Sequence, residues 1–101
     1  MDITPELMNG ASPYLSKLHY DSIKREAVLI AVNNPEDMID VRMVTFPEVL
    51  KYSEEIEDLD DDLIEGVIGI HWMSENQICI KTDIREVIIT LAGKPYGHTI
   101  T

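Results

Sequence analysis

The stretch VIGIHWMSENQICIKTDIREVIITL, residues 67–91, decides the fold that the sequence predicts. Three runs rich in β-branched residues alternate in it with a polar loop at residues 74–77 and a turn at Asp83-Ile84. Short apolar runs separated by polar turn residues are typical of consecutive antiparallel strands. We therefore expect a meander of three strands, over residues 67–73, 78–82 and 86–91.

Two more strands and two helices complete the predicted domain. The apolar run at 26–32 indicates a strand buried on both faces and central in its sheet, and residues 41–45 indicate another strand. The capping box TFPE at 45–48, followed by apolar residues at helical spacing, predicts a helix over 47–57. Ser12-Pro13, with apolar residues following at helical spacing, predicts a short helix ending near Tyr20.

The sum is an α+β fold in a single domain, residues 1–101. Its mainly antiparallel sheet of about five strands carries one or two helices packed on one face. Residues 93–101 follow a cluster of breakers, and they form either a loose C-terminal tail or a short edge strand.

Composition excludes several classes of protein. The chain has 101 residues, 45% of them hydrophobic, and a net charge of −11. Phosphate groups would repel such a chain, so we expect no direct contact with nucleic acid or an anionic membrane. The lone cysteine, Cys79, cannot form an internal disulfide, and residues 1–6 lack a secretory signal pattern. We therefore expect a cytoplasmic location.

The negative charge is concentrated in one segment. Residues 48–65 hold nine of the nineteen acidic residues and only one of the eight basic residues. Like-charged runs are usually solvated surface. Here, however, Leu59, Leu63 and Ile64 interleave with the acids and should pin the segment to the body of the domain. We therefore expect an ordered acidic patch that steers a basic protein toward it.

No catalytic or metal signature accompanies that patch. Residues 58–62 place acids at positions 1, 3 and 5 of a calcium loop, but Leu63 stands where the loop needs Gly and Gly69 where it needs Glu. The three histidines are far apart in sequence, and Cys79 lies in the middle of a strand without a catalytic motif around it. We expect no cofactor, no metal, no catalytic residue and no enzyme.

The function that we expect is that of a small inhibitor. An acidic chain without catalytic groups suits an immunity protein or antitoxin that neutralises a basic partner, such as a nuclease toxin or another nucleic-acid-active protein. The expected partner-binding residues are acids of the patch and aromatic anchors: Glu54, Glu55, Glu57, Asp58, Asp60, Asp61, Asp62, Tyr52 and Trp72, with Tyr96 as a further anchor.

The alternative is a structural or accessory subunit. In that case the apolar sheet face around Val67, His71 and Met73 drives docking or homodimerisation, and the acidity serves only solubility. A third reading, a divalent-dependent hydrolase built on the acidic loop, ranks last because no acid and base pair can be named.

Overall fold

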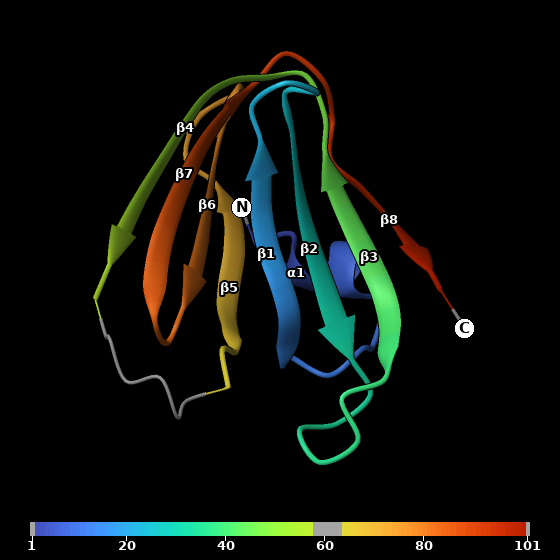
Figure 1. The fold of residues 1–101 in the computed structure, drawn as a ribbon. Helices are drawn as coiled ribbons and strands as arrows, with labels where there is room; N and C mark the ends of the chain where they lie inside the picture. The colour runs from blue at the N-terminus through green and yellow to red at the C-terminus, as the bar shows by residue number, and fades with distance from the viewer. Residues whose placement is uncertain (1, 58–63, 101) are drawn as a thin grey trace.

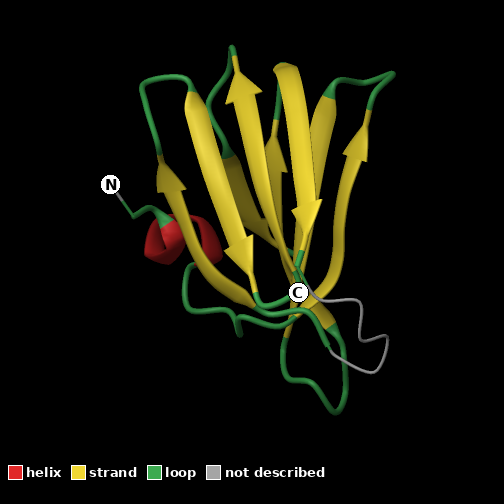
Figure 2. Ribbon diagram, turned by 90° about the vertical axis from the view of Figure 1, so that its left-hand side faces the viewer, coloured by secondary structure: helices red, strands yellow, loops and turns green. Residues whose placement is uncertain are grey.

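The computed structural model describes residues 2–57 and 64–100, which form two antiparallel β-sheets facing each other (Figure 1). The first sheet has the strand order β1-β2-β3-β8: β1 (Leu15–Asp21), β2 (Glu26–Val32), β3 (Asp40–Phe46) and β8 (Tyr96–Thr99). The second has the order β4-β7-β6-β5: β4 (Val49–Ile56), β5 (Val67–Trp72), β6 (Gln77–Thr82) and β7 (Arg85–Leu91). Among the described residues a single short helix, α1 (Thr4–Met8), lies beside the strands (Figure 2).

The α+β expectation is therefore wrong, because both predicted core helices are strands. Residues 12–20 contribute to β1, and residues 47–57 contribute β4. At the expected helix start, Glu48 instead has a φ of 52°, and the chain turns there from one sheet to the other. Two residues of the supposed apolar stripe are largely in solvent, Leu50 at 60% and Ile56 at 53% exposure.

β-Bulges explain why these strands look helical. In β1 the register with β2 shifts between Leu15 and Lys17, so Leu15 and Leu18 both point into the core although they are three residues apart. In β4 the register with β7 shifts between Val49 and Lys51, which brings Val49 and Tyr52 to the inner face in the same way. An extra residue in a strand converts its alternation into a spacing of three, which mimics a helical turn.

The predictions for the other strands agree more closely with the structure. The meander is confirmed, because β5 pairs with β6 and β6 pairs with β7. β2 is central, as expected, but it is not buried on both faces: its inner residues Ala27, Leu29 and Ala31 and the final Val32 are fully buried, whereas Val28 and Ile30 are half-buried on the outer face. The C-terminal residues 96–99 pair with β3 as an edge strand.

The core lies between the two sheets, where each contributes its inner face. Its largest fully buried side chains include Phe46, Leu29, Ile70, Ile80 and Ile89. The open edge of β5 is covered at both ends. Near its start, Val67 N–H donates to Pro13 O at 2.8 Å, and further along Ile3 N–H donates to Ile70 O at 2.8 Å. Such cover protects an edge strand from pairing with other chains.

Candidate functional site

The predicted acidic patch begins on β4, where its charges meet an arginine from β7. The guanidinium of Arg85 forms a two-pronged ion pair with Glu65, with Nε–Oε2 and Nη2–Oε1 distances of 2.7 Å, and its Nη1 also pairs with Glu54. Thr82 Oγ1 donates a further hydrogen bond to Glu65 at 2.7 Å. We call these four residues the Arg85 cluster. Its hydrogen bonds to Glu65 raise the pKa of Arg85, so the cation persists at any ordinary pH.

Tyr52, a predicted aromatic anchor, points inward beside this cluster. Its ring stacks on Tyr20 of the other sheet, with centroids 4.7 Å apart and planes 7° from parallel. Burial, followed by the neighbouring charge of Glu54, raises the pKa of Tyr52 to about 12. Tyr52 thus joins the two sheets through a contact inside the protein.

The other predicted acidic residues differ in their surroundings. Glu57 forms an ion pair with Lys81 of β6, while Glu55 is exposed on the outer face of its sheet. Asp58, Asp60, Asp61 and Asp62 lie outside the described residues. Within residues 48–57 and 64–65, cations from the later strands β6 and β7 therefore bind part of the negative charge that the sequence concentrates there.

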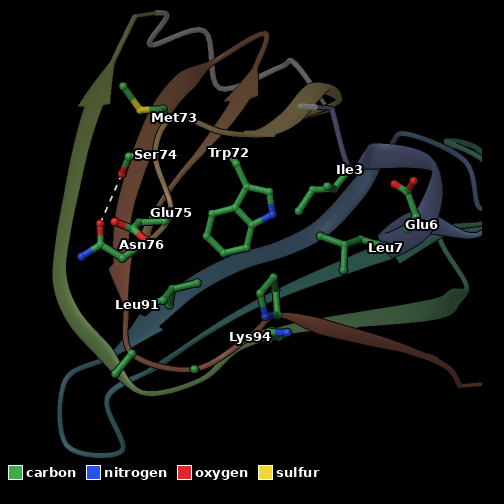
Figure 3. Close-up of a pocket in the computed structure, with 13 residues that line it drawn as sticks. Ile3, Glu6, Leu7, Trp72, Met73, Ser74, Glu75, Asn76, Leu91 and Lys94 are labelled. Carbon is green, nitrogen blue, oxygen red and sulfur yellow. Dashed lines mark hydrogen bonds between the residues drawn. The ribbon is translucent and has the colours of Figure 1, made fainter.

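Trp72, the second predicted anchor, lies in a pocket of about 990 Å³ (Figure 3). Three segments distant in sequence build its walls: the N-terminal segment with α1, the turn from β5 to β6, and the connection from β7 to β8. The structure does not gather the predicted site residues, because neither Tyr52 nor any described acid of the 48–65 segment lines this pocket. The volume is at the upper end of the range for ligand pockets.

The pocket has an apolar floor and a charged rim. Leu7 of α1 and Leu91 of β7 are buried, and Trp72 is half-buried against the core between them (Figure 3). Glu6 and Glu75 are exposed on the rim. Lys94 is exposed on the rim as well, and none of the three charged residues takes part in an ion pair with another described residue.

The β-hairpin that carries Trp72 also carries exposed apolar side chains. Met73, which lines the pocket, is 51% exposed, and Ile68 near the start of β5 is 66% exposed. Strict alternation along the strand would turn Ile68 to the same face as Trp72, but a register shift between Val67 and Gly69 leaves it exposed. Of the residues that the accessory-subunit reading singles out, His71 and Met73 are exposed, whereas Val67 is partly buried and packs against the core.

Chemistry at other positions is limited. Among residues 2–57 and 64–100, no three His, Cys, Asp or Glu side chains come together as metal ligands. Cys79 is buried, and burial raises the pKa of its thiol, which disfavours the reactive thiolate. In the same described ranges there is no helix with the length and apolar character that a membrane crossing requires.

Comparison with known proteins gives a relative that belongs to a multi-subunit enzyme. The chain is 30% identical over 86 residues to the C subunit of the aspartyl/glutamyl-tRNA(Asn/Gln) amidotransferase of Prochlorococcus marinus (strain MIT 9211). The alignment covers 82% of this chain and 89% of the relative. No family model and no solved structure matches the chain.

This similarity overturns the favoured reading from the sequence. An immunity protein or antitoxin that inhibits a nuclease toxin is wrong, because the relative is a subunit of an amidotransferase. The expectation of a protein partner agrees with a subunit, whereas a toxin partner has no support. The extent of the match identifies the family. The chain belongs to the family of C subunits of the aspartyl/glutamyl-tRNA(Asn/Gln) amidotransferase.

Proposed function

We propose that this protein is a non-catalytic accessory subunit of an amidotransferase that acts on aspartyl-tRNA or glutamyl-tRNA. The observation that carries the proposal is the similarity to an amidotransferase C subunit, which extends over 86 residues and 89% of the relative. A match of that extent concerns the whole domain and not one shared motif. The proposal keeps the expected cytoplasmic location and the expected absence of catalytic residues.

The charge of the chain favours contact with protein subunits over contact with tRNA. A net charge of −11 repels phosphate, and basic side chains that could offset it are few. Of these, Arg85 and Lys81 are already engaged with Glu54, Glu65 and Glu57. In this proposal the other subunits hold the tRNA, and the exposed acidic residues outside the contact with those subunits keep this chain soluble.

Exposed apolar residues on the β5–β6 hairpin support a docking role. Met73 lines the pocket and Ile68 lies near the start of β5, and both are more than half exposed. Exposed apolar side chains are typical of surfaces that bind another protein. This surface is the one that we propose for the contact with the larger subunits.

Reconstitution tests the proposal. The remaining amidotransferase subunits of the same organism are purified with and without this chain, and conversion of aspartyl-tRNA or glutamyl-tRNA to the amide form is measured. We expect the chain to co-elute with those subunits in gel filtration and to raise the rate or the stability of the assembled enzyme. Separate elution and unchanged activity would contradict the proposal.

A further inference from the structure

We propose that the pocket around Trp72 takes an apolar side chain from an extended, positively charged segment of a partner subunit. The inference rests on the proposed function for the source of that segment. The features that recognise the segment belong to this chain alone: an apolar floor, a rim with a net negative charge, and an indole N–H that no other described residue engages.

The floor suits an apolar side chain. Leu7 and Leu91 are buried at the base of the pocket, and the indole of Trp72 lies beside them (Figure 3). Indole rings that are partly exposed in a concave site are typical anchors of protein interfaces, because they bury a large area with little loss of side-chain freedom. The volume of about 990 Å³ leaves room for neighbouring residues of the incoming segment.

The rim selects the charge of the segment. Glu6 lies on α1 and Glu75 on the turn from β5 to β6, and against these two carboxylates stands one ammonium, that of Lys94. Because none of the three is engaged by another described side chain, all are available to an occupant. The negative balance of the rim, within a chain of charge −11, favours Lys or Arg next to the apolar residue. Such a cation can also lie on the face of the indole.

The indole N–H of Trp72 favours a partner segment with an extended backbone. Trp72 Nε1 donates no hydrogen bond to another described residue, whereas Ser74 Oγ on the adjacent turn donates to Asn76 Oδ1 at 3.2 Å. An indole N–H prefers an acceptor when its ring becomes covered. A peptide carbonyl beside the inserted side chain would supply that acceptor.

The wall of the pocket is fixed before any partner arrives. Arg42 of β3 is buried, and its Nε donates a 2.7 Å hydrogen bond to Leu7 O on α1. The backbone of Gly97 in β8 lies close against this contact, where a Cβ would come within 2.6 Å of Leu7 O. These contacts hold Leu7 in place, and a preorganised site loses less entropy on binding.

The experiment uses the single tryptophan of the chain as the probe. The full chain is labelled with 5-fluorotryptophan, and the 19F resonance of Trp72 is followed during titration with the capped peptide Gly-Arg-Leu-Lys-Gly. We expect a saturable shift. We also expect affinity to fall by about tenfold, equivalent to about 1.4 kcal/mol, when Leu is replaced by Ala or both basic residues by Glu.

A charge variant shows where the peptide binds. Glu75→Lys reverses an exposed rim charge and should weaken binding of the original peptide by about tenfold. Glu36→Lys, with the same change of net charge on an exposed loop between β2 and β3, should leave the affinity unchanged. Absence of a shift, equal affinity for the three peptides, or equal effects of the two variants would overturn the inference.

Reconstitution with the amidotransferase subunits distinguishes failure of this inference from failure of the proposed function. If the subunits assemble but the basic peptide does not shift the 19F resonance of Trp72, only the inference about the pocket is wrong. If the peptide binds as expected but no amidotransferase subunit associates with the chain, the proposed function is wrong and the specificity of the pocket stands.

Discussion

The Arg85 cluster, which lies beside Tyr52, and the pocket around Trp72 both place acidic residues near an aromatic side chain, yet the acids have opposite roles in the two regions. In the Arg85 cluster the carboxylates of Glu54 and Glu65 bind a cation of the same chain. In the pocket Glu6 and Glu75 have no ion-pair partner among the described residues. The comparison teaches that acidic density along a sequence does not locate a docking surface. What matters is whether the fold brings a cation to those acids.

The largest predicted effect is the loss of the cation in the Arg85 cluster. Arg85→Met should lower the free energy of unfolding by about 3 kcal/mol, because it leaves the mostly buried carboxylate of Glu65 and the more exposed one of Glu54 without a counter-charge. Urea denaturation measures the change. Lys24→Met removes a positive charge from an exposed residue and should cost less than about 0.5 kcal/mol. Equal losses in the two variants would mean that the cluster is no more than solvated surface.

A second prediction concerns the wall of the pocket. Gly97→Ala places a methyl group 2.6 Å from Arg42 Nη2 and Leu7 O, so α1 or β8 must shift, at a cost of about 2 kcal/mol. Gly69→Ala in β5 meets nothing within 4 Å and serves as the matched control. Thermal unfolding and the peptide titration should both separate the variants. If Gly97→Ala retained full stability and full peptide affinity, the contact from Arg42 to α1 would not be what shapes the pocket.

The stacked Tyr52 makes stability depend on pH in the alkaline range. Because burial and the charge of Glu54 raise the pKa of Tyr52 from 10.0 to about 12, the folded chain keeps a proton that the unfolded chain releases. The stabilising contribution is complete below pH 10 and is lost as the pH rises through about 12. Over that window the free energy of unfolding should fall more steeply in the unmodified protein than in Tyr52→Phe. If urea denaturation gave the same decrease of the free energy of unfolding with pH in both proteins, the Tyr52 hydroxyl would have to be exposed to solvent.

The smallest effect is expected for the ion pair between Glu57 and Lys81. Both side chains are substantially exposed, at 44% and 30%, so water and salt screen the attraction. Glu57→Gln should change the free energy of unfolding by less than about 0.5 kcal/mol. A larger loss in urea denaturation would show that the end of β4 depends on its acids as strongly as the Arg85 cluster does.

Four strands were predictable from the sequence, β2 and the three of the meander, whereas β1 and β4 were not. The β5–β6–β7 meander and β2 follow from runs of β-branched residues between polar breaks. In β1 and β4 the extra residue of the bulge moves the second inward residue to position i+3, a spacing that also fits a helix. Local pattern alone does not distinguish these cases, because the bulge is defined by the neighbouring strand.

The candidate site was predictable only at Trp72. An aromatic anchor could be named from its residue type, but the walls of its pocket come from α1 and from the β7–β8 connection, which are far away in the chain. Conversely, the ion-pair partners of Glu54 and Glu57 lie on β7 and β6, 31 and 24 residues later in the sequence. Long-range strand pairing decides both which charges are neutralised and where a concavity forms, and one sequence does not reveal that pairing.

The most direct test of the central claim follows Trp72 in the assembled enzyme. The chain labelled with 5-fluorotryptophan is mixed with the unlabelled remaining amidotransferase subunits, and the 19F spectrum of its single tryptophan is recorded. We expect the Trp72 resonance to move to a new position as the complex forms, and Glu75→Lys to weaken this transition. A stable complex in which the Trp72 resonance keeps its original position would show that the pocket does not contact the other subunits.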